Sequence, residues 1–466
     1  MTDFDVVVVG SGPGGAVTAQ QCVLAGLKVA VIEKGDHNLI EDEFGLGQLL
    51  NNYKHAGMTS FLGENPISYV EGSVLGGGSV VNAGLYHRTP RTKITDWINS
   101  GSIQLDCAEV EGLQLEVEDI LKLEVTPDEF ISEASFKFAF GAKKLKWECI
   151  NVPRWYAHGA KFPKKNSMNE LIHQKLATFP NVEYFTRCEV LKLAERDDGV
   201  VLSFYDHLKN FTRKVSAKYV FMCAGAIDSP SILKFSGYLK RQKLFVGCHP
   251  SAKVVATFKN ELKNGTHSIG PHQVKEFFPD FSLGCSVSSP GYVKQALIGS
   301  YDQELPIGEI RRSAVYYANI DSKNNRLLFI PFLKNPIIRS GFSDSDFIRL
   351  KRGIVELARV VFEADAECVR LSSSVINVST SLEEFTSFVN SISKKDLNLM
   401  TIHLFSSLPM GPHSANPVAY GGLLKGTKRI FVNDASIFPS PIGANPQGTV
   451  MMLALNNVRK FLKESY

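Results

Sequence analysis

The sequence lacks several patterns that mark whole classes of protein. Its eight cysteines include no CxxC pair, which argues against a zinc ribbon or a redox dithiol. No basic run is interleaved with aromatic residues, so nothing indicates binding to nucleic acid. No apolar run is long enough to cross a bilayer, and no secretory leader precedes the first predicted strand. We therefore expect a cytoplasmic protein without a transmembrane segment or a metal site.

The residues that are present suit a large globular protein. The chain has 466 residues, of which 44% are apolar, and this is enough to bury large cores. The formal net charge of +4 is small for this length and indicates no strongly charged partner. The length exceeds one ordinary domain and favours two domains that share a cofactor.

The chain begins with the pattern of a βαβ unit. The β-branched run Val6–Val9 predicts a buried parallel strand, Gly14–Ala25 a helix, and Lys28–Ile32 a second strand. Strand-like runs over residues 189–223 predict a meander whose last strand returns to the central sheet. A final strand is predicted at Arg429–Val432.

The middle of the chain predicts a different kind of sheet. Strand-like runs at Ala252–Phe258, Ala314–Ile320 and Arg326–Phe332 favour an antiparallel arrangement. The residues Ser322–Asn325 are typical of a hairpin turn between two of these runs. Asp344–Ala364 has the periodicity of a long amphipathic helix.

A dinucleotide motif lies between the first strand and the first helix. Gly10-Ser11-Gly12-Pro13-Gly14-Gly15 has the form GxGxxG. Gly10 permits the tight turn, Gly12 lets the backbone approach a pyrophosphate, and Gly15 allows close contact between helix and strand. Glu33 ends the second strand and suits a ribose 2′-hydroxyl. The motif by itself does not separate NAD from FAD.

A second glycine-rich block indicates the cofactor. Residues 71–84 read EGSVLGGGSVVNAG. This block resembles the flavin-contacting signature of the glucose–methanol–choline (GMC) oxidoreductases, and it is closest to the variant of the cholesterol oxidases. Ser73 stands where the family prefers a basic residue or Asn. Val81 stands where some members attach FAD through a histidine; because valine cannot form that bond, we expect FAD to be held non-covalently.

Three further segments resemble the same family. Residues 224–237 match AGAxxSPxxLxxSG, and residues 431–439 resemble the strand and turn that place an Asp, here Asp434, near the FAD ribityl or pyrophosphate group. Residues 443–449 (GANPQGT) resemble the GxNPxxT segment that opens the last helix. In the family, the N-terminus of that helix points at the flavin pyrimidine ring, where its positive end stabilises the anionic reduced flavin.

The resemblance implies a set of residues that contact FAD. They are Gly10, Gly12, Gly14, Gly15, Glu33, Lys34, Gly76, Gly77, Gly78, Ser79, Asn82, Ala83, Gly84, Val190, Ala224, Gly225, Asp434, Ala435, Asn445, Pro446 and Gln447.

The resemblance also implies a catalytic pair. Thr401-Ile402-His403, followed by Met410-Gly411, resembles the family's catalytic histidine segment, and Asn445 matches its asparagine. A histidine suits removal of a hydroxyl proton near neutral pH, and an asparagine can donate to the developing oxyanion. Simpler readings are a buried, satisfied histidine and an Asn-Pro helix start. His413 is the second candidate for the base.

Other candidates for the substrate site have simple alternatives. His87 follows the flavin loop and would then line the cavity, although a loop histidine is the simpler reading. Glu356, Glu363 and Glu367 could supply a carboxylate from the substrate domain, although a solvated helix face explains them as well.

The expected architecture is α/β, with a Rossmann-type FAD-binding domain and a second, α+β substrate domain built on an antiparallel sheet. The FAD-binding domain is expected to comprise residues 1–102, 164–246 and 399–466. Residues 103–163 would form a mainly helical insertion, and residues 247–398 the substrate-binding domain.

The expected function is FAD-dependent oxidation of a CH–OH group by hydride transfer to flavin N5. Thirty phenylalanines favour a small apolar alcohol as substrate. The alternative is a lyase of the same family that keeps FAD for structure. A flavin reductase linked to NAD(P) would need a second GxGxxG motif, which the sequence lacks. Dioxygen, a quinone and a redox protein all stay open as electron acceptor.

Overall fold

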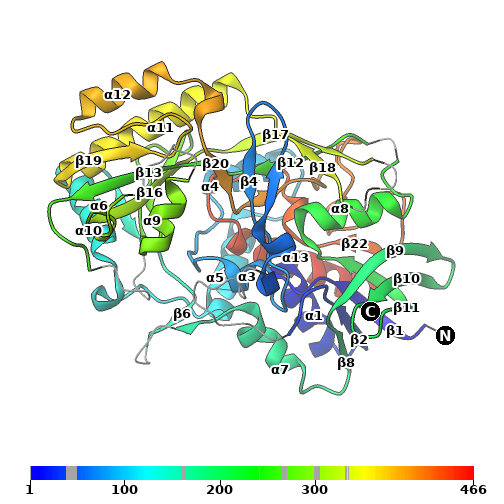
Figure 1. Cartoon of the computed structure of the whole chain (residues 1–466). Coiled ribbons are helices and arrows are strands. Elements are labelled where there is room, and N and C mark those ends of the chain that lie inside the picture. Colours follow the sequence, from blue (N-terminus) through cyan, green and yellow to red (C-terminus); the bar gives the residue numbers. More distant parts are fainter. Residues whose placement is uncertain are drawn as a thin grey trace.

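The computed structural model describes residues 2–37, 50–158, 164–240, 242–263, 270–298, 305–330, 333 and 335–466. Figure 1 shows two parts: a mostly parallel sheet near both chain ends, and an antiparallel sheet with helices around it. The structure thus has the predicted α/β architecture, a Rossmann-type unit joined to an α+β unit.

The mostly parallel sheet starts from the βαβ unit. In spatial order its described strands are β8 (Val182–Phe185), β2 (Val29–Ile32), β1 (Phe4–Val9), β11 (Phe211–Met222), β10 (Gly199–Asp206) and β9 (Cys188–Arg196), with β22 (Ile430–Val432) also beside β11. β10 runs antiparallel to both of its neighbours, so the predicted meander and its return to the sheet are confirmed. Val6, Val7 and Val8 are fully buried, as a strand covered on both faces requires.

Two helices begin where neighbouring strands of this sheet end. α1 (Pro13–Leu24) follows β1, α8 (Gly225–Phe235) follows β11, and β1 pairs with β11. The last helix, α13 (Gln447–Ser465), packs against α1. The carboxyl edge of such a sheet is where open α/β folds bind their ligands.

The antiparallel sheet is formed by segments from many parts of the chain. Its described strands are β3 (Thr59–Phe61), β4 (Ile67–Tyr69), β20 (Leu399–Thr401), β13 (Ser251–Phe258), β16 (Ser313–Asn319), β15 (Ser282–Cys285), β14 (His272–Val274) and β5 (Cys149–Asn151), with β19 (Ala366–Leu371) also beside β13. β3 and β4 come from residues 1–102, and β5 from residues 103–163. The division into domains stays a prediction.

The two faces of this sheet are covered by different helices. Tyr316 donates to the Ala134 carbonyl of α6 (Glu133–Lys144), and Ala318 lies beside Gly353 of α11 (Asp344–Glu363). α12 (Leu382–Ser391) packs on α11. On the opposite face, Val255 and Val315 pack with residues of α9 (Pro290–Ala296) and α10 (Ile307–Arg311). Alternate residues of β13 and β16 therefore face two different environments.

A smaller sheet contains the residues that the sequence predicted to form a hairpin turn. Its described strands are β18 (Ile337–Arg339), β17 (Ser322–Leu328), β12 (Leu244–Cys248) and β21 (Leu404–Phe405). The predicted hairpin turn at Ser322–Asn325 is wrong, because these residues lie inside β17, and β16 and β17 belong to different sheets. The Asn325 side chain donates to the Val246 carbonyl and accepts from the Gly341 N–H, so tertiary contacts override its preference for turns.

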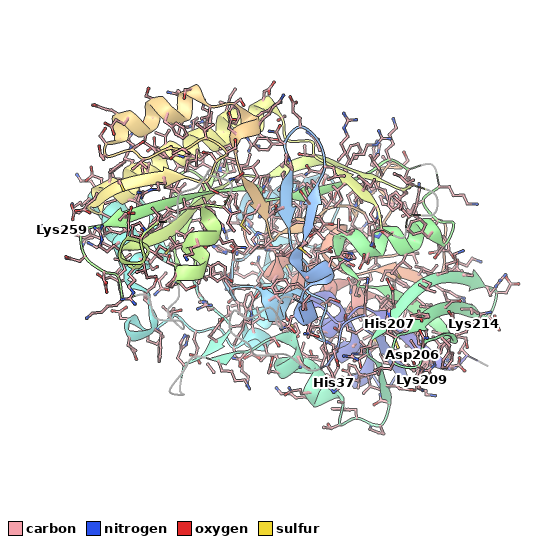
Figure 2. All side chains as sticks on the ribbon, in the orientation of Figure 1. His37, Asp206, His207, Lys209, Lys214 and Lys259 are labelled. Carbon is pink, nitrogen blue, oxygen red and sulfur yellow. The ribbon has the colours of Figure 1, made fainter. Side chains whose placement is uncertain are left out.

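The strand predicted at Arg326–Phe332 ends at Leu328, and residues 331 and 332 lie outside the described part of the chain. The remaining described elements are α3 (Gly78–Val81), α4 (Arg91–Asn99), α5 (Cys107–Leu121), β6 (Tyr156–Ala157), β7 (Lys164–Lys165), the π-helical turn Asn169–His173, α7 (Gln174–Leu176), and the 3-10 turns at Lys54–Gly57, Asp128–Phe130, Lys394–Asp396 and Ala435–Ile437. Within the described residues, no helix combines the length and the apolarity that a membrane span needs. Exposed lysines mark opposite ends of the molecule, with Lys214 on β11 and Lys259 beyond β13 (Figure 2).

Candidate active site

A cavity of about 1270 Å³ connects the carboxyl edge of the parallel sheet with the antiparallel sheet. Ordinary small-molecule sites measure roughly 300–1,000 Å³, so this cavity has room for a dinucleotide and a further small molecule. The predicted residues that line it are Gly10, Gly12, Gly14, Glu33, Lys34, Gly77, Gly78, Asn82, Ala83, Gly84, Val190, Ala224, Gly225, His403, Asp434, Ala435, Asn445, Pro446 and Gln447. Gly15, Gly76 and Ser79 lie behind this wall.

The glycines of the GxGxxG turn serve different purposes. A Cβ added to Gly14 would lie 2.0 Å from the Asn433 carbonyl oxygen, and one added to Gly15 would lie 2.0 Å from the Gly10 carbonyl oxygen. These two positions therefore need glycine for packing. At Gly12 an added Cβ would meet no atom within 4 Å. Gly12 borders open space at the N-terminus of α1, where free N–H groups suit a phosphate.

A buried carboxylate lies at the end of β2. Glu33 Oε2 accepts from the Ser11 N–H at 2.9 Å and the Ser11 hydroxyl at 2.6 Å, and its Oε1 accepts from the Gly35 N–H at 2.7 Å. Burial raises the pKa of this carboxyl, and the three donors act against that rise. Glu33 is thus a fixed acceptor on the cavity wall, and its chemistry suits a ribose hydroxyl.

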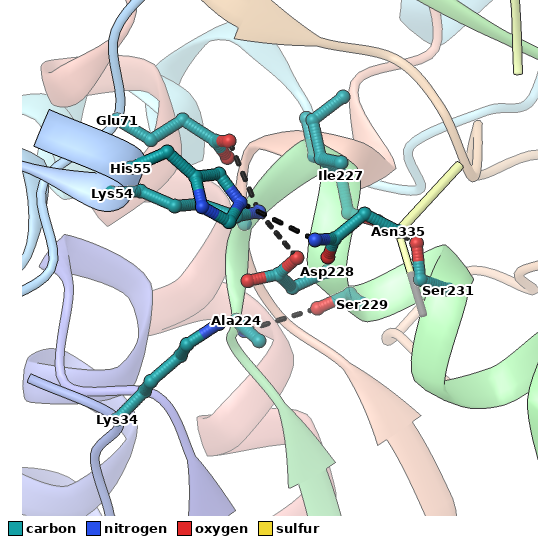
Figure 3. Close-up of polar contacts among 12 residues, drawn as sticks. Lys34, Lys54, His55, Glu71, Ala224, Ile227, Asp228, Ser229, Ser231 and Asn335 are labelled. Carbon is teal, nitrogen blue, oxygen red and sulfur yellow. Dashed lines mark hydrogen bonds and ion pairs between the residues drawn. The ribbon is translucent and has the colours of Figure 1, made fainter. Parts of the chain in front are cut away.

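A second charged group at this end has no motif in the sequence. The buried Lys54 ammonium lies 2.6 Å from Asp228 Oδ1 and 3.2 Å from Glu71 Oε2 (Figure 3). Burial opposes ionisation of Asp228, but Lys54 outweighs it and lowers the pKa of that carboxyl. Nearby, Lys34 pairs with Glu189 at 3.0 Å. Glu71, Asp228 and Glu189 at this end of the cavity are therefore each paired with a lysine.

The flavin-loop residues are held by the last helix. Asn82 Nδ2 donates to Gln447 Oε1 at 2.8 Å, and Asn82 Oδ1 accepts from the Gly84 N–H at 3.0 Å. Asn82 thus fastens the loop to the first residue of α13. Val81 lines the cavity from the same loop.

Asp434 fixes the start of α8. Its Oδ2 accepts from the Gly225 N–H at 2.8 Å and the Ser229 hydroxyl at 2.5 Å, and its Oδ1 accepts from the Ser436 N–H at 2.8 Å. A Cβ added to Gly225 or to Gly78, at the start of α3, would meet no atom within 4 Å. Open backbone at the starts of α1, α3 and α8, together with the Glu33 acceptor, fits the phosphates and sugar of a dinucleotide.

Two histidines meet at the far end of the cavity. Gly247 and Cys248 of β12 pair with Phe405 and Leu404 of β21, so the residues beside these strands are neighbours. His403 Nδ1 lies 2.9 Å from Nδ1 of His249, and both rings line the cavity. Burial lowers the pKa of His403 well below its ordinary value, and His249 and Lys275 lower it further. His403 is therefore neutral near pH 7.

A carboxylate completes this group. His249 Nε2 lies 2.7 Å from Asp321 Oδ1, at the point where the chain passes from β16 to β17. Burial opposes ionisation of Asp321, but His249 and other groups lower its pKa overall. The same Oδ1 accepts from the Gly443 N–H at 3.0 Å. Asp321 thus contacts both the histidine pair and the segment that carries Asn445.

Two polar groups of this end are open to a ligand. Among the described residues, the Asn445 side chain and His403 Nε2 have no hydrogen-bond partner, and both residues line the cavity. Asn445 immediately precedes Pro446, the N-cap of α13. An imidazole nitrogen and a side-chain amide thus share one cavity with the helix N-terminus.

The segment after His403 departs from the family's glycine-rich pattern, yet it is firmly held. Ser406, Leu408 and Met410 donate their N–H groups to carbonyls of residues 435–437. The Ser407 hydroxyl donates to the Ala226 carbonyl. The non-glycine residue Ser406 has a φ of 57°, in the left-handed region that glycine would reach without strain.

The other predicted candidates are not among the residues that line the cavity, although burial lowers the pKa of His87, and this residue is close enough to His403 and His249 for both to lower it further. His413 is exposed, and its Nδ1 accepts from the Ala415 N–H. His87 is partly buried and does not line the cavity. The three glutamates lie on the surface side of α11 and β19: Glu356 pairs with Arg359, Glu367 pairs with Arg312, and Glu363 is exposed.

Sequence reasoning missed His249, Asp321 and the cavity-facing Lys253. The family element VGxxxxDH matches the sequence here only at Val246-Gly247, and its Asp and His positions are Ala252 and Lys253, so it gave no signal for His249. Asp321 stands beside the residues that suggested a hairpin turn, and no pattern linked it to a histidine.

Comparison with known proteins decides the family. Models of the GMC oxidoreductases match residues 4–255 and residues 332–454. The chain belongs to the GMC oxidoreductase family. This GMC oxidoreductase is 27% identical to the uncharacterized GMC-type oxidoreductase y4nJ of Sinorhizobium fredii, over 99% of this chain and 95% of the relative. It is 23% identical to the long-chain-alcohol oxidase FAO4A of Arabidopsis thaliana, over 97% of this chain and 67% of the relative.

The fold of this GMC oxidoreductase is similar to that of pyridoxine 4-oxidase from Mesorbium loti. The TM-score is 0.77 at 14% identity, and the match covers 99% of this chain and all of the other. Members of the family are flavoproteins, and alcohol oxidases are among the relatives. The likeness of the flavin loop to the cholesterol-oxidase branch stays a prediction from the sequence.

Proposed function

We propose that this protein binds FAD non-covalently and oxidises the CH–OH group of an alcohol, with His403 as base and Asn445 as hydrogen-bond donor. The observation that carries this proposal is the pair of unpartnered groups, His403 Nε2 and the Asn445 amide, in one cavity with the N-terminus of α13. FAD bound in this cavity would supply the acceptor for the hydride that leaves the alcohol carbon.

The contacts of His249 set the tautomer of His403. The negative charge of Asp321, 2.7 Å from His249 Nε2, favours the His249 tautomer that carries its proton on Nε2. In that tautomer Nδ1 of His249 is bare and accepts from the Nδ1–H of His403. His403 Nε2 is left without a proton and can take the hydroxyl proton of the alcohol. The positive charge that forms on His403 is stabilised through His249 by Asp321.

A direct experiment separates this function from that of a lyase that keeps FAD for structure. An alcohol found in a dye-coupled screen is added to the yellow protein without oxygen. An oxidoreductase must bleach its flavin, with loss of the absorbance near 450 nm (an approximate flavin maximum). A yellow colour that persists while substrate is consumed would favour the lyase.

We expect Asp321→Asn to slow flavin reduction by about 10- to 10²-fold, less than loss of the base itself. Without the carboxylate charge, protonated His403 is less stable and its pKa falls. The rate declines as pH falls through that pKa, so its acid limb should move to lower pH in the variant. Stopped-flow reduction between pH 4 and 9 (an approximate working range) measures both effects.

The surroundings of the pair are the same in parent and variant. In the parent, the charge of Lys275 lowers the pKa of His403, and the charge of Lys93 lowers the pKa of Asp321. Asp365→Asn is the control, because it removes a carboxylate that is 70% exposed at the end of α11. A parental rate and an unmoved acid limb in Asp321→Asn would show that Asp321 does not act through His249.

Precipitation with acid should release all of the yellow colour into the supernatant. Val81 offers only a hydrocarbon side chain on the flavin loop, so no bond to the isoalloxazine is expected there. Absorbance of the supernatant and fluorescence of the denatured chain on a gel measure the two fractions. Flavin that stays on the denatured chain would contradict non-covalent binding.

A further inference from the structure

The antiparallel sheet presents a polar floor to the cavity. Ser251 and Lys253 of β13, and Tyr317 and Asn319 of β16, line the cavity. Lys253 is directly opposite Tyr317, and Ser251 is directly opposite Asn319, so all four share one face of the sheet. Gly284 of β15 leaves room for the Tyr317 ring, because a Cβ there would lie 2.4 Å from Tyr317 Oη. This floor differs from the apolar one that the phenylalanine content favoured.

Within the described part of the chain, the Lys253 ammonium has no counter-charge. Among the described residues it has no carboxylate and no hydrogen-bond acceptor, and burial lowers its pKa. A cation withdrawn from water without a partner costs free energy. Lys54, at the other end of the same cavity, has two carboxylates within 3.2 Å. An anion bound beside Lys253 would supply the missing partner.

The charges of the cavity wall are divided between its two ends. All described acidic residues of the wall belong to the nucleotide end: Glu33, Glu71, Glu189, Asp228 and Asp434. The wall of the substrate end contains Lys253 and Arg154, and the carboxylate of Asp321 lies behind this wall, paired with His249. Arg154 is buried, donates to the Ala83 carbonyl, and leaves Nη1 without a partner. The low-dielectric walls of a cavity strengthen the electric field of these cations, and that field attracts anions.

The distance from the base to this cation suits a compact substrate. Lys253 follows His249 by four residues, which include the junction at Pro250 between β12 and β13, so their Cα atoms are at most roughly 13 Å apart at about 3.3 Å per residue. The ring of His249 contacts His403. A molecule about as long as one para-substituted benzene ring can therefore place its hydroxyl at His403 and an anionic group near Lys253.

We propose that the substrate is an anionic alcohol, a carboxylate or phosphate that carries the reacting CH–OH group, and that Lys253 binds its anionic group. This inference rests on the proposed CH–OH oxidation and specifies its substrate class.

Calorimetric titration of the FAD-loaded protein tests the anion site without turnover. The probes are 4-methylbenzoate, 4-methylphenyl phosphate and the neutral 4-methylbenzamide. We expect one of the anions to bind about 10- to 100-fold more tightly than the amide, as for hydrogen bonds to a charged group. The anion that binds more tightly indicates whether the substrate is a carboxylate or a phosphate. Lys253→Met should abolish the preference and Lys253→Arg should keep it.

Lys214→Met is the matched control, because it removes an exposed lysine on β11 that does not line the cavity (Figure 2). Flavin content and melting temperature report whether each variant is folded. If Lys253→Met does not fold, Lys253→Gln and the salt dependence of anion binding to the parent replace it. Equal binding of anions and amide by the parent, or an unchanged preference in a folded Lys253 variant, would overturn the proposal.

Turnover separates this proposal from the proposed function. The ratio of kcat/KM for 4-(hydroxymethyl)benzoate over 4-(hydroxymethyl)benzamide should exceed about 10 in the parent and approach 1 in Lys253→Met. Oxidation of both alcohols at equal efficiency would overturn the anion site and leave alcohol oxidation intact. Tight anion binding without flavin reduction by any alcohol would support the anion site and contradict alcohol oxidation.

Discussion

His403→Ala is expected to slow flavin reduction by about 10²–10⁴-fold, the usual cost of removing a general base. The alcohol hydroxyl then has no neutral imidazole to receive its proton. The variant should keep its flavin, because the His403 ring lies at the substrate end of the cavity and the phosphate cradles lie at the other end. Anaerobic stopped-flow absorbance with the best alcohol from the screen measures the rate directly.

Two further variants test whether His403, and not another residue, is the base. Asn445→Ala should show a smaller defect, about 10²–10³-fold, as for loss of one donor to a developing oxyanion. His413→Ala should reduce its flavin at the parental rate, because that side chain is exposed. Parental reduction by His403→Ala would show that the base is misassigned. A defect confined to His413→Ala would move the base to that residue.

Gly12→Val is expected to yield a folded protein that has lost about nine-tenths or more of its flavin. The backbone of Gly12 has φ −61° and ψ −176°, which valine adopts without strain, and its Cβ would meet no protein atom. The new side chain would instead project into the space that a pyrophosphate needs at the N-terminus of α1. The ratio of flavin to protein absorbance after desalting gives the content, and gel filtration shows the fold.

Gly112→Val provides the comparison for this result. Gly112 lies exposed in α5, and a Cβ there also meets no atom within 4 Å, but the site is far from the cavity wall. This variant should retain its full flavin content. Gly14→Val should lose flavin for a different reason, because its Cβ collides with the Asn433 carbonyl and the fold itself must shift. A normal flavin content in Gly12→Val would show that the phosphate site is misplaced.

The sequence predicts best those features that depend on a few consecutive residues. The motif Gly10–Gly15 needs only a strand before it and a helix after it, and both are present as β1 and α1. The amphipathic pattern that begins at Asp344 gives α11 almost to the residue, because its apolar face packs on a sheet.

Features that depend on contacts between distant segments could not be predicted. His249 and His403 meet because β12 pairs with β21, and Asp321 reaches His249 because the chain changes sheets between β16 and β17. The residues Ser322–Asn325 are typical of a turn and so predict a hairpin instead of this change of sheet. Their side-chain hydrogen bonds form only in the assembled sheet. In the sequence, Lys253 looks like any other lysine of a strand, because its place on the cavity wall depends on how the sheet is assembled.

The alternation of β13 and β16 has a practical consequence for engineering. Their even-numbered residues, such as Val254 and Tyr316, form the core, whereas the odd-numbered Lys253, Tyr317 and Asn319 face the cavity. Substrate preference can therefore be redesigned by a library restricted to positions 251, 253, 317 and 319, while the odd-numbered Val255 and Val315 stay fixed because they pack against α9 and α10. Such changes would leave the core residues of both strands, His403 and Asn445 in place, so the floor of this cavity can be exchanged separately from the rest of the fold.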